Sequence, residues 1–495
     1  MYTKTPLSLF IICLIVAFPF VIYAQVFDSL SLTVGTQGNI AAKNYQPLWM
    51  VSNRFGTIAD IQNDLSSFVK ITNPNVFPAS GDLDEDLLVS NQKFFVNYGF
   101  SLFNNNHFKN SFFEQAFLGF LYKKWTIRIG RFEETSGDLD PELSSGSFGI
   151  SGNSLPIPQI NGAILDYIDI PLTNGWVQFK GSLAHGWLGK DRYMKDAFYQ
   201  GNTFYLRIGA HKLKLYGGLE HYSEWGGERG KVKLDRSFKG FLNVLFVKEA
   251  DDGSVGTSIN GIRPSRAGDE RGLLAAGFYW ENDVIELHGY AQMPFESGEE
   301  IDPRNRSFLA GLEVVNKDEG SVLKKVLLEL LYTKDMNYFV PLHQRQSYYN
   351  NGYYRTGWEY EDRIIGTPLF INRQRLNKYF PAIPPINWDG PDSSIPPNGN
   401  IVDNRIFAIH AGTVLSLTNE LTFKSLFTLS VNYGSLSALS KTLFTPQKTQ
   451  FYTLQSFHYQ QKYSKFKWLC EIGYDFGELG SNVGASLGVS YSILN

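Results

Sequence analysis

The chain has 495 residues, and its 45 Lys and Arg residues nearly balance its 48 Asp and Glu residues, for a formal net charge of −3. This balance argues against a nucleic-acid partner, because binding phosphates requires an excess or a stripe of basic residues. Aromatic residues make up 15% of the chain and charged residues only 19%, and there are 46 Gly. Such a composition excludes a disordered chain and a coiled coil.

Residues 1–24 have the pattern of a secretory signal peptide. Lys4 precedes an apolar stretch from Leu7 to Ile22, and Ala24 is the small residue expected before the cleavage site. We therefore expect cleavage before Gln25. The alternative is a retained membrane anchor, but the stretch is shorter than the roughly 20 residues of a membrane helix, and no basic cluster follows it. The mature chain then keeps only Cys470, which excludes an internal disulfide and a Cys-based zinc site.

Beyond Gln25, apolar and polar residues alternate, which predicts β-strands with one apolar face. Clear examples are residues 125–130, 203–209, 427–433 and 471–476. Short polar turns join many of these strands, as at 123–124, 172–175, 211–212, 281–283, 316–320 and 418–420. We count about 17 strand candidates after residue 93 and one more near 31–41, and the resulting total of about 18 is even, as in bacterial outer-membrane barrels.

This pattern predicts an all-β fold, a transmembrane antiparallel β-barrel, rather than a soluble β-sandwich. Soluble sandwiches usually have shorter strands, and they do not carry charged residues on one face of nearly every strand, whereas a wide barrel meets lipid outside and water in its lumen. Aromatic residues near strand ends are expected at the membrane interfaces: Phe132, Trp176, Trp187, Trp225, Trp280 and Tyr332.

We therefore predict one barrel domain, residues 25–495, in the Gram-negative outer membrane. Its expected partners include the outer-membrane lipid and the barrel-insertion machinery. The strand count conflicts with the expected topology of such barrels. It places the tight turn at 123–124 on the extracellular side, whereas short turns are expected to be periplasmic. We attribute this conflict to a missed or invented strand between residues 224 and 272.

Enzyme motifs are nearly absent. There is no phosphate-binding loop, dinucleotide fingerprint, HExxH or GxSxG motif, and the eight His residues are scattered. We expect no catalytic residue, metal or cofactor. The acidic run 133–142 offers carboxylates that could act as an acid/base pair on a glycosidic bond, but we interpret it as a solvated acidic loop, where such clusters commonly lie.

Two long segments interrupt the hairpin pattern, at residues 133–161 and 336–404. Long loops in a compact barrel are seldom without function. The second segment combines aromatic rings, which stack on sugars, with guanidinium groups, which bind carboxylates and hydroxyls. We predict that it binds an acidic polysaccharide through Tyr353, Tyr354, Arg355, Trp358, Tyr360 and Arg363. The alternative is that these residues pack the loop against itself or plug the lumen.

Three segments resemble the Wzi-type capsule-assembly family of outer-membrane proteins: QPLWMVSNRFG at 46–56, NSLPIPQI at 153–160 and GYYRTGWEYEDRIIGTPLF at 352–370. The last string is the most specific and is most similar to the Bacteroides-like branch. The resemblance implies an 18-stranded barrel whose loops close the lumen. It also implies a non-catalytic, lectin-like role at the cell surface, attaching or organising capsular polysaccharide. It assigns no ligand residue to a position in this chain.

Two other functions remain open. A lumen lined by Arg128, Lys180, Arg207 and Asp475 suits a passive porin for polar solutes. The third function, an outer-membrane hydrolase acting on lipid or glycan, is disfavoured by the lack of motifs.

Overall fold

The computed structural model describes residues 30–73, 94–210, 212–248, 267–341, 345 and 347–494. The predicted signal peptide and the C-terminal Asn495 lie outside the described residues. In this described part, no helix is long and apolar enough to cross a membrane.

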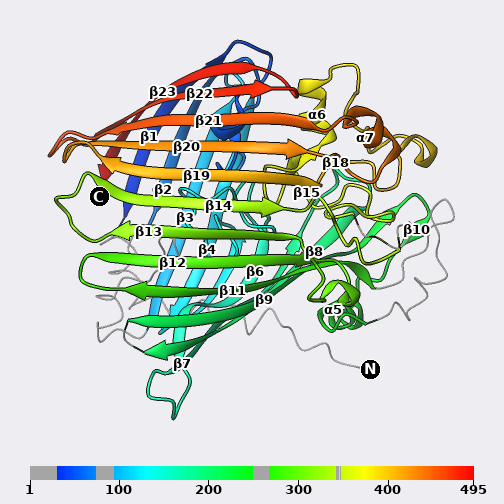
Figure 1. Cartoon of the computed structure of the whole chain (residues 1–495), viewed down its shortest axis with the longest axis horizontal. Helices are drawn as coiled ribbons and strands as arrows, with labels where there is room; N and C mark the ends of the chain where they lie inside the picture. The colour runs from blue at the N-terminus through cyan, green and yellow to red at the C-terminus, as the bar shows by residue number, and fades with distance from the viewer. Residues whose placement is uncertain are drawn as a thin grey trace, which may run out of the picture.

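Eighteen antiparallel strands of the described chain form one closed sheet, in which β1 pairs with the last strand, β23 (Figure 1). This confirms the predicted barrel. The first nine strands are β1 (Ser31–Ala41), β2 (Asn63–Thr72), β3 (Phe94–Asn105), β4 (Asn110–Tyr122), β5 (Trp125–Arg131), β6 (Gln159–Asp169), β7 (Val177–Trp187), β8 (Lys195–Ala210) and β9 (Leu213–Arg229). The other nine are β11 (Gly268–Glu281), β12 (Ile285–Phe295), β13 (Phe308–Asn316), β14 (Leu323–Tyr332), β19 (Ile406–Ser416), β20 (Leu421–Asn432), β21 (Lys448–Tyr459), β22 (Phe466–Gly477) and β23 (Asn482–Leu494).

The remaining elements are short and lie in the connections between barrel strands. The short strands are β10 (Val232–Lys233), β15 (Glu359–Tyr360), β16 (Arg363–Ile364), β17 (Ile371–Asn372) and β18 (Ile401–Asp403). The helices are α3 (Leu48–Val51), α5 (Phe238–Leu245), α6 (Arg373–Tyr379) and α7 (Ala438–Leu443), with 3-10 turns at Gly298–Glu300 and Asp392–Ser394.

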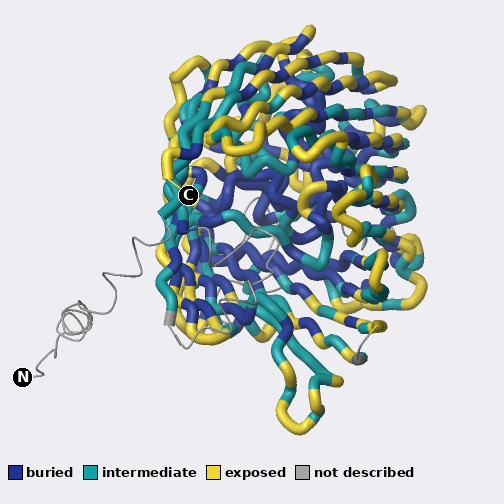
Figure 2. Tube along the Cα trace, turned by 90° about the vertical axis from the view of Figure 1, so that its left-hand side faces the viewer, coloured by how far each residue is buried: buried dark blue, intermediate teal, exposed yellow. Residues whose placement is uncertain are grey.

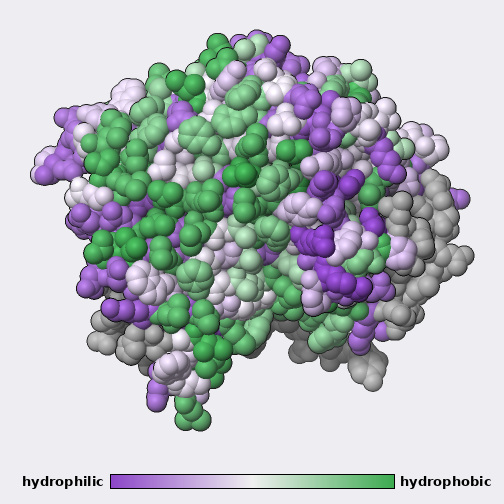
Figure 3. Space-filling model, viewed as in Figure 1, coloured by the Kyte–Doolittle hydropathy of each residue, from purple (hydrophilic) through white to green (hydrophobic). Residues whose placement is uncertain are grey.

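The apolar residues of the alternating pattern point to the outside of the barrel, and the polar residues between them point into the lumen. On β5, Ile127 and Ile129 are exposed on the outer wall, whereas Thr126 and Arg128 are buried inside. On β20, Phe427 is exposed and its neighbour Thr428 is buried. The outer wall therefore carries a broad hydrophobic surface over the strands, with hydrophilic residues gathered toward both ends (Figure 3). Because the ring is closed, these long apolar strands expose no edge.

The two ends of the barrel differ. One end, here called the turn end, has the short turns that follow β4, β6, β8, β11, β13, β19 and β21, together with the start of β1 and the end of β23. The opposite end, the loop end, has the long connections 42–62, 132–158, 230–267 and 333–405. In outer-membrane barrels the short turns are periplasmic and the longer loops extracellular, so the loop end faces outward.

The total of 18 strands agrees with the prediction, but the assignments behind it contained two errors. Strand β2 was missed, because Ser66-Ser67 and the inward Phe68 break its apolar alternation. Only 16 barrel strands then follow residue 93. The suspected segment between β9 and β11 forms β10 and α5 in its described part, and not a barrel strand. With these corrections, the turn at 123–124 lies at the turn end with the other short turns.

Two of the six aromatic residues predicted at the membrane interfaces are buried. Trp176 and Trp187 are exposed on the outer wall, and Trp280 and Tyr332 are half-buried. Phe132, however, follows β5 into the lumen, where its ring packs 3.8 Å from the guanidinium carbon of Arg128. Trp225 is covered by α5. The prediction was wrong at these two positions because a loop and a helix cover the rings that lipid was expected to meet.

Candidate functional site

Three connections from the loop end fold back into the barrel. We call residues 42–62, 132–158 and 347–376 the first, second and third segments of the plug. They contact inward side chains around the ring, from Arg271 on β11 to Asp475 on β22. Buried chain runs through the interior between the strands (Figure 2). The lumen is therefore filled at the loop end.

The second segment approaches the wall closely through its run of serines and glycines. Ser144 Oγ and the Ser145 N–H both donate to the carboxylate of Glu329 on β14, at 2.7 Å. Gln292 on β12 accepts from the Phe148 N–H at 3.2 Å and also hydrogen-bonds Ser147. Gly146 has a φ of 101°, a conformation that side chains rarely adopt. Small residues thus let the backbone of this segment reach polar groups of the wall.

The three plug segments bind one another directly. Asn153 in the second donates to the Ile364 carbonyl in the third at 2.8 Å, and the Phe55 N–H in the first donates to the Gly152 carbonyl at 2.6 Å. Arg363 in the third donates to the carbonyls of Val51 and Ile58 in the first, both at 2.6 Å. The three segments that carry the family resemblance therefore meet in one structure.

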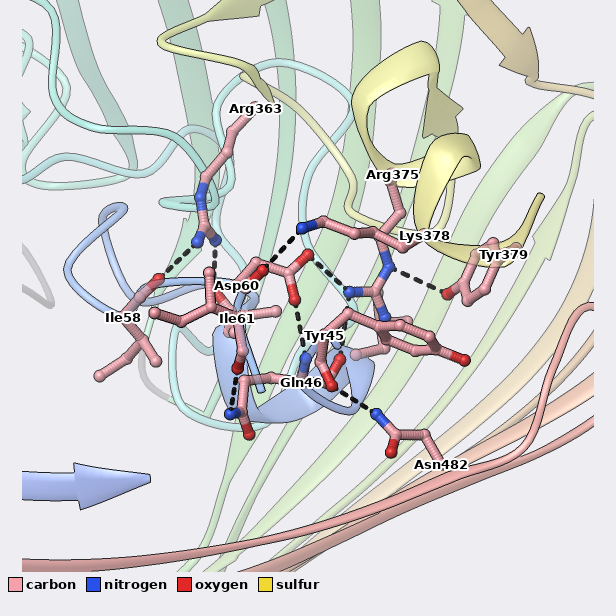
Figure 4. A network of polar contacts seen from close by, with 12 residues as sticks. Tyr45, Gln46, Ile58, Asp60, Ile61, Arg363, Arg375, Lys378, Tyr379 and Asn482 are labelled. Carbon is pink, nitrogen blue, oxygen red and sulfur yellow. Dashed lines mark hydrogen bonds and ion pairs between the residues drawn. The ribbon is translucent and has the colours of Figure 1, made fainter. Parts of the chain in front are cut away.

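A carboxylate fixes the first segment to α6 (Figure 4). Asp60 accepts from Arg375 at 2.9 Å and from the Gln46 N–H at 2.8 Å, while Lys378 donates to its carbonyl at 2.9 Å. Burial raises the pKa of Asp60, but the Arg375 charge and the Gln46 N–H outweigh this effect, so the pKa lies below its usual value. Asp60 is therefore ionised at neutral pH. Asn372 begins α6 by accepting from the Arg375 N–H at 2.9 Å.

The predicted polysaccharide residues all lie in the third segment, and their aromatic rings are buried. The Trp358 indole N–H donates to the Gly149 carbonyl at 2.8 Å, and the ring lies 4.4 Å from the Arg271 guanidinium. The Tyr354 hydroxyl donates to the Gly226 carbonyl at 3.2 Å. Tyr353 packs against Tyr354, with ring centres 5.9 Å apart. These rings connect the plug to the barrel wall.

The polar members of the predicted set are also bonded to protein. Arg355 is 1% exposed and donates to the carbonyls of Asp392 and Ile395. The Tyr360 hydroxyl accepts from Arg131 at 2.9 Å. Arg363 is half-buried. This packing corresponds to the alternative stated for these residues, in which they plug the lumen, while their role as polysaccharide ligands stays a prediction.

The acidic run 133–142 lies inside the barrel. Asp138 pairs with Lys180 on β7 and accepts from the Tyr167 hydroxyl at 3.1 Å, and Asp140 lies 2.6 Å from the ammonium of Lys325. Burial raises the pKa of Asp138, but the charge and hydrogen bond of Lys180, the charge of His288 and the hydrogen bond from Tyr167 together lower it by more, so the pKa lies below its usual value. The interpretation as a solvated loop was right only in part, because lysines of the wall pair with the buried carboxylates of Asp138 and Asp140, whereas Glu142 is exposed.

Below the plug, a cavity of about 1170 Å³ extends toward the turn end. We call it the vestibule. The acidic run forms part of its lining, as do the predicted lumen residues Arg128, Lys180 and Arg207, with Lys212 near the turns. Asp475 also faces the lumen, but the plug covers it, and it accepts the Leu48 N–H at 2.9 Å. Charged side chains of both signs thus line the vestibule together with apolar and aromatic ones, and the plug bounds it.

Within the described residues, no group of three His, Cys, Asp or Glu side chains could hold a metal ion. The first plug segment was not predicted as a plug, and neither were the side chains of the wall that bind the plug segments. One signal was available: Glu329 is a charged residue between Leu328 and Leu330 on a strand with an apolar outer face. A carboxylate that points into the lumen from such a strand indicates that polar groups lie inside the lumen next to it.

No protein-family model matches the chain, and no curated protein matches it. Among solved structures, it is similar to Wzi of Escherichia coli, described as an outer-membrane protein involved in group 1 capsule assembly and a carbohydrate-binding β-barrel. The TM-score is 0.55 at 13% identity, covering 93% of this chain and 85% of that one. OpdL of Pseudomonas aeruginosa matches with a TM-score of 0.46 at 7% identity, covering 94% of this chain and 98% of that one. OprD of the same organism matches with a TM-score of 0.44 at 9% identity, covering 94% of this chain and 96% of that one.

The likeness to Wzi concerns the fold. This chain is a closed antiparallel barrel of the outer-membrane type. Together with the hydrophobic outer wall, the fold places the protein in the Gram-negative outer membrane.

Proposed function

We propose that this protein is a non-catalytic, lectin-like barrel of the Wzi type, which binds capsular polysaccharide and helps attach or organise it at the cell surface. The observation that carries the proposal is the plug. It is built from the same three segments that carry the family resemblance, and it fills the lumen at the loop end. A filled lumen gives solutes no wide path, whereas the loop end offers a surface to an external polymer.

Exposed side chains at the loop end have the chemistry that an acidic glycan requires. The Arg306 guanidinium lies 4.5 Å from the ring centre of Tyr338, and that of Arg304 lies 4.9 Å from the ring centre of Phe339. Tyr338 and both arginines are exposed. Guanidinium groups bind carboxylates, and aromatic faces stack on sugar rings. We call these four residues the rim cluster.

The predicted ligand residues Tyr353, Tyr354, Arg355, Trp358, Tyr360 and Arg363 are the second proposed contact. Because all of them except the half-buried Arg363 are buried, polymer reaches the set only if the third plug segment moves. The rim cluster needs no such movement. Binding at the predicted ligand residues therefore requires movement of the plug, whereas binding at the rim cluster does not, and an experiment can distinguish the two contacts.

The test measures capsule retained on washed cells of the producing bacterium after deletion of the gene and complementation with variants. We expect deletion to release capsule into the medium. Replacing Arg304, Arg306 and Tyr338 with Ala should reproduce the loss with normal barrel abundance. The matched control replaces Lys462 and Tyr463 with Ala. The Lys462 ammonium lies 5.2 Å from the ring centre of Tyr463, so this is also a pair of a cation and an aromatic ring, but it lies at the turn end. If deletion leaves capsule retention unchanged, the proposed function is wrong.

The buried set is tested with Tyr354, Arg355, Trp358 and Arg363 replaced by Ala. Capsule loss with a correctly inserted barrel and an intact plug supports a ligand role. Failure of the barrel to accumulate, or a loosened plug, shows instead that these residues are structural.

A passive channel is the second candidate function. The observation that favours it is the vestibule, whose volume and charged side chains suit polar solutes. Conductance separates it from the first candidate.

A further inference from the structure

Part of the outer wall departs from the apolar surface of the barrel. On β8 and β9, the outward pair Phe204 and Leu219 is exposed, and the next outward pair toward the loop end is Asn202 and His221. His221 Nε2 lies 2.6 Å from Glu270 on β11. Polar groups facing lipid are costly unless they are covered. This part of the wall therefore needs an apolar cover of its own.

Helix α5 packs on the wall in this region. The ring of Phe241 lies 6.3 Å from Trp225 and 5.8 Å from His185. Just before the helix, the Arg236 guanidinium lies 4.7 Å from the ring centre of Phe198. Ser237 begins the helix by accepting from the Gly240 N–H. Aromatic contacts and a capped start thus fix α5 against the outside of the barrel at the loop end.

The opposite side of α5 and its flanks are apolar and cationic. Phe238 is 75% exposed and Phe246 65% exposed, and Val247 is exposed beside them. The exposed cations Arg236, Lys239 and Lys248 flank these residues. The Phe238 ring stacks on Phe241 at 6.0 Å and still leaves most of its surface exposed. Two such exposed phenylalanine rings on one short helix are unusual for a surface in water.

The surroundings of α5 indicate what meets this surface. Trp187 ends β7 on the outer wall and is exposed, and its ring lies 5.3 Å from His185, which α5 contacts. Tryptophan at a strand end is typical of the membrane interface. The exposed face of α5 is therefore continuous with the surface that already meets lipid, at the level of the headgroups.

We propose that α5 is an interfacial anchor, which inserts Phe238 and Phe246 into the outer leaflet and sets its cations against the phosphates of anionic lipid headgroups. Apolar residues of such helices lie at the boundary of the acyl chains, while Lys and Arg bind anionic lipid. This surface is separate from the proposed polysaccharide contacts, so the inference does not depend on the proposed function.

The test measures the depth of a fluorescent probe in the full barrel reconstituted into vesicles. Cys470 is first replaced by Ser, and Val247→Cys then carries an environment-sensitive fluorophore, which leaves both phenylalanines in place. The control probe is Tyr463→Cys, at a turn-end residue that is 93% exposed. In phosphatidylcholine vesicles, we expect lipids brominated near the headgroup to quench the probe at 247, and aqueous iodide to quench it several-fold less than the probe at 463.

Two sets of variants test the two parts of the proposal. Phe238→Ser with Phe246→Ser should restore iodide quenching at 247. Arg236→Gln, Lys239→Gln and Lys248→Gln together should make the probe shallower in vesicles containing lipid A and leave it unchanged in phosphatidylcholine. Equal iodide quenching at 247 and 463 overturns the proposal. So does protection at 247 that appears only at high protein density, because it shows that a second copy covers α5.

Discussion

Arg363 joins two plug segments with a single side chain. Its guanidinium donates to the buried carbonyl of Ile58 (Figure 4) and to that of Val51. A buried carbonyl left without a donor costs about 1–3 kcal/mol. We therefore expect Arg363→Ala to speed hydrogen exchange of residues 46–61 roughly tenfold or more, since each 1.4 kcal/mol is about a factor of ten.

The matched control for Arg363 is Arg306→Ala, an exposed arginine whose loss leaves no buried partner. It should not change exchange in the first segment. Unchanged exchange at 46–61 in Arg363→Ala would contradict the role of Arg363 as a connection between segments. Heat-modifiable migration in detergent gels checks that both variant barrels are folded.

Glu359 gives the plug a pH dependence. One carboxylate oxygen accepts from Asn372 and Asn400, both at 2.7 Å, and burial raises the pKa of Glu359 to about 7. A folded-state pKa above the unfolded value favours the protonated form. The resulting stability is fully present below about pH 4.5 and is lost as pH rises through 7, by up to about 1.4 kcal/mol per unit.

We therefore expect the third plug segment to exchange more slowly at pH 5.5 than at pH 8, after correction for intrinsic exchange. Glu359→Gln keeps the shape without the charge, so most of this difference should disappear. Two further carboxylates account for a residual difference: Glu300, whose pKa burial also raises to about 7, and Glu296, whose pKa burial raises and which accepts from the Tyr349 N–H at 2.7 Å. An identical pH dependence in the wild type and the variant would show that Glu359 is not the responsible group.

At the residue scale, the sequence predicted the aromatic and arginine cluster but not its partners. Trp358 and Arg363 do lie together in one segment. Their partners are the carbonyls of Gly149, Val51 and Ile58, more than 200 residues earlier in the chain. Every residue has a carbonyl, so no local pattern marks these three as acceptors. The composition of a loop indicates what it can bind, and packing decides what it does bind.

At the scale of elements, two wall side chains hold the second plug segment. Glu329 binds Ser144 and Ser145, and Gln292 binds Ser147 and Phe148. We expect Glu329→Ala with Gln292→Ala to leave the barrel folded while residues 143–155 become sensitive to protease. Glu319→Ala, in the β13–β14 turn, is the control. Full protection in the double variant would mean that the other plug segments hold this one without the wall.

The strands were predictable because alternation is a local signal that lipid outside and polar groups inside both enforce. The signal failed where something other than lipid covers a strand. Phe68 of β2 turns inward to stack on Phe103, at 5.2 Å, and Trp225 of β9 packs under α5. In both cases, a tertiary contact replaced the environment that the pattern assumes.

At the scale of the whole molecule, the closed ring and the plug are separate structures. The ring is held by strand pairing all the way round, including β1 with β23. The plug is held by side chains such as Arg363, Arg375 and Glu329. Losing plug contacts should therefore open the lumen without unfolding the barrel, because the pairing of the wall does not pass through the plug.

Conductance across a planar bilayer tests the closed lumen most directly. We predict that the intact protein, inserted as a folded barrel, gives little or no stable current, because the plug fills the loop end above the vestibule. Removing residues 143–155 together with 348–370 should produce steady conductance from the same barrel. A large, steady conductance from the intact protein would contradict the account and favour a channel for polar solutes.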